Sequence, residues 1–143
     1  MVISGNKVFI NRINKLEEYL SRLEEIRKVS KEKFLSDWKS QDLALRNLQV
    51  AIEACIDIGE YLITINNWNV PETYVETIKV LQKNGVIKKE FAEKMVDLVK
   101  FRNIIVHDYL YIDYKKVYKN LQRLDEFRNF VKVVVEYLKK KKN

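Results

Sequence analysis

Four side chains that can do acid–base or anion-binding chemistry lie in one short segment: Arg102, Asn103, His107 and Tyr109. An arginine can hold a phosphodiester and stabilise the negative charge that develops on its oxygens. A histidine, whose ordinary pKa is about 6.5, can remove the proton from a ribose 2′-hydroxyl near neutral pH. Arg102 and His107 therefore predict metal-independent RNA cleavage by attack of the neighbouring hydroxyl, which leaves a cyclic phosphate and a 5′-hydroxyl. DNA lacks that hydroxyl and would not be cut in this way.

Arg102 and Asn103 stand where the helical pattern reserves positions for apolar side chains. The two stripes that they interrupt contain Phe91, Met95, Leu98 and Ile105, and Ala92, Val96, Val99 and Val106. Because burying a guanidinium without a partner is costly, two interpretations stay open. Arg102 either pairs with Glu53 or Asp57 and merely sets helix register, or it faces a cleft and meets an anion there. Glu53 and Asp57 are expected to orient Arg102 or His107.

His107 follows Asn103 by four residues, so a helix places the two side chains on one face. An amide beside an imidazole can hold the ring in one tautomer and orientation. His107 is the only histidine, and one imidazole cannot easily serve as both base and acid in a concerted cleavage. We therefore predict a symmetric homodimer that brings an Arg102–His107 pair from each copy to a shared cleft.

Apolar periodicity predicts that long helices position this segment, since apolar residues recur at steps of three and four and glycine and proline are few. The expected helices cover residues 6–29, 42–65, 72–83, 88–107 and 113–140, with a short packed turn around Phe34. The helix over 42–65 should be central because it is apolar around much of its circumference. Pro71 suits the first turn of the next helix, and Asn84-Gly85 suits its C-terminal cap.

The predicted fold class is all-α, an antiparallel helical bundle of four to five main helices. We expect a single domain over residues 1–143, with a basic frayed tail at about 139–143.

The charge balance suits a polyanionic partner such as RNA. The net charge is +7, but four lysines form the run 139–142, which can equally be a solvated end. Cys55 and the single histidine cannot build a Cys/His metal cluster within one chain, and neither metal nor cofactor is expected. The sequence lacks a signal-peptide pattern and an apolar stretch long enough to cross a membrane, so a cytoplasmic location without a membrane partner is predicted.

The segment that carries the chemistry also resembles a known family. Residues 102–107 are similar to the R-N-x-x-x-H form of the R-x(4–6)-H motif of HEPN domains. Asp108-Tyr109 extends the match to R-x(4)-H-x-Y, the form seen in HepT-like toxins of HepT–MntA (type VII) toxin–antitoxin pairs. The resemblance spans roughly residues 43–124, including a run over 51–60 that is similar to the central helix of that family.

The resemblance implies a role for each residue of the motif. Arg102 and His107 match the catalytic pair of a ribonuclease, and Asn103 matches the polar residue beside the arginine. Tyr109 matches the tyrosine that the nucleotidyltransferase antitoxin MntA modifies with AMP. An anionic adduct there would fill the cleft and compete for Arg102. The family also implies a homodimer that cleaves RNA and binds the antitoxin.

Two other functions fit the same residues. The dimer cleft can grip RNA or a nucleotide without cleaving it, as a non-catalytic binding module. The chain can also serve mainly as the structural helical partner of a nucleotidyltransferase. Tyr109 can then be simply an amphipathic aromatic at a helix end, with its ring packed and its hydroxyl in water.

Overall fold

The structure is a computed structural model that describes residues 3–142, and every regular element among them is a helix. The elements are α1 (Ile3–Ile26), α2 (Lys31–Ser36), α3 (Trp38–Ile65), α4 (Tyr74–Lys83), α5 (Lys89–His107), the short 3-10 helix η1 (Tyr109–Tyr111), α6 (Tyr114–Leu121) and α7 (Leu124–Lys142). The all-α prediction is confirmed, although the described residues form seven α-helices rather than four to five. Both ends of the predicted domain, Met1 and Asn143, lie outside the described residues.

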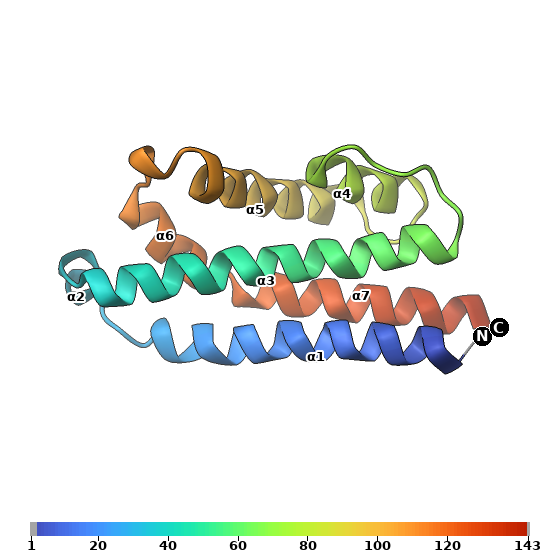
Figure 1. The fold of residues 1–143 in the computed structure, drawn as a ribbon, viewed down its shortest axis with the longest axis horizontal. Coiled ribbons are helices and arrows are strands. Elements are labelled where there is room, and N and C mark those ends of the chain that lie inside the picture. The colour runs from blue at the N-terminus through green and yellow to red at the C-terminus, as the bar shows by residue number, and fades with distance from the viewer. Residues whose placement is uncertain (1–2, 143) are drawn as a thin grey trace.

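Helix α3 is the centre of the molecule and contacts all six other α-helices. In Figure 1, α1 and α7 run along one side of α3, and α4 and α5 lie on its other side. The long helices alternate in direction along the chain, so that α1 and α5 run opposite to α3 and α7. The structure thus agrees with the predicted antiparallel bundle and with the predicted central place of the helix over 42–65.

The hydrophobic core surrounds α3 and includes side chains from the helices on both of its sides. The apolar circumference of the helix over 42–65 predicts this arrangement. The largest fully buried side chains are Phe34, Phe127, Phe130, Leu16, Leu20, Leu23, Leu48, Ile52, Ile56, Ile58, Leu62 and Ile78. Full burial of one such side chain stabilises the fold by about 1.5–3 kcal/mol relative to its exposure. Within residues 3–142, no helix is both long enough and apolar enough to span a membrane.

Helix α4 begins later than predicted. Pro71 was expected in its first turn, but the helix begins at Tyr74, because the Thr73 hydroxyl accepts a hydrogen bond from the Glu76 amide at 3.1 Å. The Glu76 carboxylate in turn accepts one from the Glu72 amide at 2.9 Å. Thr73 and Glu76 have the spacing of a capping box, a helix-start signal that was present in the sequence and outweighs the proline.

The other helix boundaries lie close to those expected. Gly85 adopts a left-handed φ of 78° just after Asn84, so the predicted C-terminal cap of α4 is confirmed. The packed turn around Phe34 is helix α2. Helix α7 continues through the lysines of the tail to Lys142, so this stretch is helical in the structure, and fraying of that end stays a prediction.

The prediction of a single helix over 113–140 is wrong. The chain forms two helices, α6 and α7, which are separated at Gln122 and Arg123. Periodicity did not reveal the break because Val117, Leu121 and Leu124 are fully buried on both sides of it. The apolar pattern records which side chains face the core, and here it continues across an interrupted backbone.

Arg123 connects the segment between α6 and α7 to the rest of the fold. Its guanidinium bonds the Glu126 carboxylate at 2.6 and 2.9 Å, and the Nη1 atom reaches Asp97 of α5 at 2.6 Å. Nη1 also reaches the side chain of Asn120 at 3.0 Å, and Nη2 reaches the carbonyl of Lys94 at 3.2 Å. The hydrogen bond with Glu126 raises the pKa of Arg123 above its ordinary value. Arg123 therefore ties the α6–α7 junction to α5, the helix that carries the motif.

We expect Arg123→Met to lower the free energy of unfolding by about 1–3 kcal/mol, because Glu126 would lose its partner while largely buried. Arg22→Met is the matched control, since Arg22 and Glu18 form an exposed pair with side-chain exposures of 52% and 47%. That control should cost less than about 1 kcal/mol. Urea unfolding of both variants measures the difference, and equal losses would contradict the role given to Arg123.

Candidate active site

Helix α5 passes from the core into solvent along its length. Its first turns bury Ala92, Met95, Leu98 and Val99, and Phe101 is only 5% exposed. Residues 102–105 are half-buried, and every residue from Val106 to Tyr111 is exposed. The helix ends at His107, where the Asp108 amide still donates to the Ile104 carbonyl at 2.9 Å. The motif therefore lies at the edge of the core, where a polar side chain can keep partners inside the fold and still face solvent.

Arg102 is held by three elements. Its Nε and Nη2 atoms lie 2.8 and 2.7 Å from one carboxylate oxygen of Glu53 on α3. Nη1 donates to the Asn103 side-chain oxygen at 3.2 Å, and the guanidinium carbon lies 4.8 Å from the centre of the Tyr74 ring on α4. The structure thus contains the predicted ion pair with Glu53. Because each terminal nitrogen carries two N–H groups, these contacts leave donors on both that can meet an anion.

Asp57, the other carboxylate expected near Arg102, faces helix α1. Arg12 of α1 donates from Nη1 to the Asp57 main-chain carbonyl at 2.7 Å. Burial raises the pKa of the Asp57 carboxyl, the Arg12 cation lowers it, and the Glu53 carboxylate raises it. Burial and the charge of Asp57 also raise the pKa of Glu60, one turn further along α3. The polar stripe of α3 is therefore divided, with Glu53 facing α5 and Asp57 facing α1.

Asn103 contacts Arg102 rather than His107. Its side-chain oxygen accepts from Arg102, and among the contacts of residues 3–142 the His107 ring has neither a hydrogen bond nor an ion pair. The expected tautomer control by Asn103 is therefore not seen, because the charged guanidinium beside it is the stronger donor. His107 follows Arg102 by five positions in the helix, which corresponds to about 140° of rotation and about 7.5 Å along the axis. Within one chain the two side chains therefore point in different directions.

Tyr109 lies beyond the end of α5, in the exposed helix η1. Its side chain is 68% exposed, and its neighbours Leu110 and Tyr111 are 78% and 79% exposed. The Tyr111 amide closes the turn by donating to the Asp108 carbonyl at 2.8 Å. Tyr109 is therefore accessible to a modifying enzyme, and the alternative of a packed ring does not describe it in this single chain.

Tyr74 is the residue of this site that sequence reasoning missed. It begins α4 and places its ring against the Arg102 guanidinium, an arrangement in which the ring quadrupole attracts the cation. No periodicity links the two residues, since they belong to helices that meet only in the folded molecule. The single detectable signal was the capping sequence before Tyr74, which marks where the helix begins.

The described residues contain no group of three or more His, Cys, Asp or Glu side chains that could hold a metal ion. Cys55 lies in the core of α3, where burial raises the pKa of its thiol. In that position Cys55 packs as a small apolar residue.

Comparison with known proteins identifies the family. The sequence model of the family described as ribonuclease HepT-like matches residues 16–134. The chain belongs to this family. The HepT-like resemblance inferred from residues 102–109 is thereby confirmed.

Two relatives and one solved structure show how far the similarity extends. The mRNA nuclease HepT of Shewanella oneidensis is 28% identical over 130 residues, which cover 90% of this HepT-like chain and 97% of that protein. The tRNA nuclease HepT of Aphanizomenon flos-aquae is 26% identical over 128 residues, with 89% and 87% covered. The tri-AMPylated HEPN toxin of Shewanella oneidensis, solved in complex with MNT antitoxin, has a TM-score of 0.84 and 27% identity, with 90% and 97% covered.

The charges around Asp57 should move its pKa in opposite directions. We expect Arg12→Gln to raise the pKa of Asp57 further, because the neighbouring cation is removed, and Glu53→Gln to lower it, because a like charge is removed. Carboxyl-carbon NMR titration measures both. Because the folded pKa is raised, stability falls as pH rises from the usual carboxyl pKa through the raised value, and Arg12→Gln should steepen that fall.

Lys15→Gln is the matched control for this titration, because Lys15 lines the same cavity as Arg12 and Asp57 but pairs with Glu18 at 3.5 Å. It should leave the pKa of Asp57 nearly unchanged. Shifts of the same sign in the Arg12 and Glu53 variants would show that the charges around Asp57 are assigned wrongly.

Proposed function

We propose that this HepT-like protein is a metal-independent endoribonuclease toxin that acts as a homodimer. Arg102 and His107 of both copies form one composite site, and AMP modification of Tyr109 by an MntA-like nucleotidyltransferase antitoxin silences it. Family membership and the nuclease names of the relatives support the RNA-cleaving activity. One relative is named for mRNA and the other for tRNA, so the proposal names RNA as the substrate class.

The observation that carries the proposal is the way Arg102 is held. Glu53, Asn103 and Tyr74 fix the guanidinium at the edge of the core, with donors left on its two terminal nitrogens. A preorganised cation of this kind stabilises charge in a transition state without reorganising during the reaction. The remaining supporting residue, Asp57, acts through the charge that it places next to Glu53.

The reaction needs one proton acceptor and one proton donor. His107 of one copy takes the proton from the 2′-hydroxyl, whose oxygen attacks the phosphorus atom. The bond from phosphorus to the 5′-oxygen then breaks, and His107 of the second copy protonates the leaving oxygen. Both Arg102 side chains hold the non-bridging oxygens, on which negative charge grows. The products are a 2′,3′-cyclic phosphate and a 5′-hydroxyl.

Helix geometry supports the proposal that two copies of the chain form the site. Arg102 and His107 of one chain differ in direction by about 140° around the helix, so a single copy does not present both to one phosphate. A two-fold axis near the end of α5 would bring the arginine of each copy toward the histidine of the other. The exposed apolar side chains of η1, Leu110 and Tyr111, continue this surface.

RNA cleavage in the presence of a chelator tests the catalytic pair. We expect His107→Ala and Arg102→Ala each to reduce cleavage by about 100-fold or more, since base catalysis and charge stabilisation each contribute at least that much. Lys100→Ala, an exposed residue on the same helix, is the charge-matched control and should keep wild-type activity. The cyclic-phosphate product is followed by mass spectrometry.

The same assay separates the competing functions. RNA that is bound but never cleaved would favour the non-catalytic module, and loss of cleavage on adding the chelator would exclude the metal-free mechanism. Mixing the wild-type protein with His107→Ala, under conditions in which subunits exchange, should lower cleavage by more than dilution does, because each mixed dimer keeps only one of the two histidines that the reaction needs. Activity that simply follows the amount of wild-type chain would contradict the composite site.

Tyr109→Phe should cleave RNA normally and escape silencing by an MntA-like nucleotidyltransferase with ATP, because it lacks the hydroxyl that accepts AMP. Tyr111→Phe is the matched control, since Tyr111 is equally exposed in the same helix and should still be silenced. Intact-protein mass spectrometry measures the added AMP. AMP found on Tyr111, or unchanged silencing of Tyr109→Phe, would refute the role of Tyr109.

A further inference from the structure

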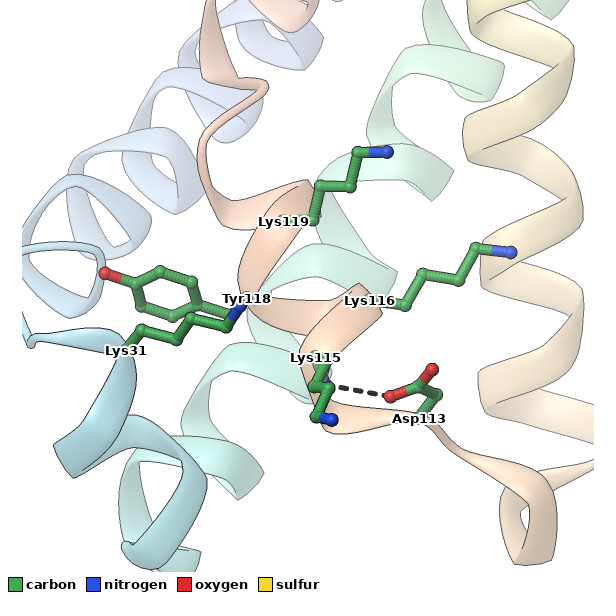
Figure 2. Close-up of a pocket in the computed structure, with 6 residues that line it drawn as sticks. All are labelled: Lys31, Asp113, Lys115, Lys116, Tyr118 and Lys119. Atoms are coloured by element: carbon green, nitrogen blue, oxygen red, sulfur yellow. Dashed lines mark hydrogen bonds between the residues drawn. The ribbon is translucent and has the colours of Figure 1, made fainter.

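A second basic site lies beside the motif, where α6 packs against α2. A cavity of about 510 Å³ is lined by Lys31, Asp113, Lys115, Lys116, Tyr118 and Lys119 (Figure 2). Lys31 comes from α2, and the other lysines come from successive turns of α6. In Figure 2 the ammonium groups of Lys116 and Lys119 extend to one side of α6, whereas Lys31 lies on its other side, next to Tyr118. Four lysines from two helices therefore line this hollow.

The lysines of this cavity form no ion pair within residues 3–142, as is also true of several other surface lysines. By contrast, Lys15, Arg22, Arg27 and Lys28 of the α1 region all pair with glutamates one turn away. The only carboxylate in the lining, Asp113, accepts a hydrogen bond from the Lys115 amide at 3.0 Å and caps α6 (Figure 2). The cavity is therefore strongly positive, and it suits a polyanion.

The frame of the cavity is rigid. The Tyr118 hydroxyl donates to the Val29 carbonyl at 2.9 Å, and its ring lies 5.3 Å from the ring of the fully buried Phe34. Tyr118 thus fixes α6 to α2, so the lysines from both helices keep their relative places. Only the flexible lysine chains have to be ordered when an anion binds, which lowers the entropic cost of binding.

The lysine cavity adjoins the segment that carries the proposed chemistry. Asp113 and Lys116 also line a smaller cavity of about 210 Å³, whose other walls include Phe101, Ile104 and Tyr111. Phe101 and Ile104 flank Arg102 and Asn103 in α5, and Tyr111 ends η1. Lys116 therefore links the lysine cavity to the end of α5 and to η1.

We propose that Lys31, Lys115, Lys116 and Lys119 form a docking surface for the backbone phosphates of the RNA substrate, away from the bond that is cut. The inference rests on the proposed ribonuclease function, and it adds where the rest of the substrate lies. Phosphate contacts carry no base information, so this surface gives affinity and direction rather than sequence preference.

The test is the triple variant Lys115→Gln/Lys116→Gln/Lys119→Gln, built both in the wild-type chain and in His107→Ala. Binding of a 2′-O-methyl RNA of about 20 nucleotides to the His107→Ala background should weaken roughly 10-fold or more. The slope of the logarithm of the binding constant against the logarithm of the salt concentration should become shallower by about two, since each lost phosphate contact removes about 0.7. The control Lys139→Gln/Lys140→Gln/Lys141→Gln removes the same charge from the end of α7 and should change both quantities much less.

Cleavage by the triple variant separates this inference from the proposed function. KM for long RNA should rise about 10-fold with kcat retained, while cleavage of a dinucleotide stays at the wild-type rate. An unchanged KM, or an equal loss in the α7 control, would overturn the docking surface and leave the ribonuclease standing. RNA binding that is unchanged while AMP modification is lost would assign the lysines to a protein partner, which also overturns it. If the wild-type protein itself cleaves no RNA, that result would instead reject the proposed ribonuclease function.

Discussion

The pairing of Glu53 with Arg102 is the interaction on which the rest of the site depends. The Arg102 side chain is 15% exposed and its partner 27%, so both charges have lost most of their water and neither is stable there without the other. The pair joins α3, the helix that contacts all other α-helices, to α5, the helix that ends in the motif. A structural and a functional role for Arg102 are therefore compatible, because the contacts that set the register of α5 also set the direction of the remaining guanidinium donors.

The position of the motif on α5 decides what it can do. The first half of this helix is anchored in the core through Met95 and Leu98, and Arg123 at the α6–α7 junction bonds to its Asp97 side chain. From Val106 to Tyr111 the chain is exposed, and within residues 3–142 the His107 ring has neither a hydrogen bond nor an ion pair. In the proposed site, Arg102 is thus held rigidly, whereas His107 is exposed to solvent. A second copy that packs against this end would order the histidines and complete the site.

Charge is distributed unevenly over the molecule, and the distribution matters more than the net value of +7. Near α1, Lys15 and Arg22 pair with Glu18, and Arg27 pairs with Glu24. The lysines around α6 form no ion pair within residues 3–142, and Lys116 among them shares a cavity with the end of α5. The lysine run over 139–142 is the most basic stretch of the sequence, but in the structure it continues α7. Lys141 lies near the rings of Trp68 and Tyr137.

The sequence by itself determined the helices, the central place of α3, the cap at Gly85 and the anomaly at Arg102, because each depends on neighbours within a few turns. It missed the break at Gln122 and Arg123, since Leu121 and Leu124 keep the apolar pattern in phase across it. Only the tertiary structure decided that Glu53 rather than Asp57 pairs with Arg102, and that Tyr74 covers the guanidinium. These choices depend on how helices distant in sequence pack side by side, whereas periodicity records only which face of each helix is turned toward the core.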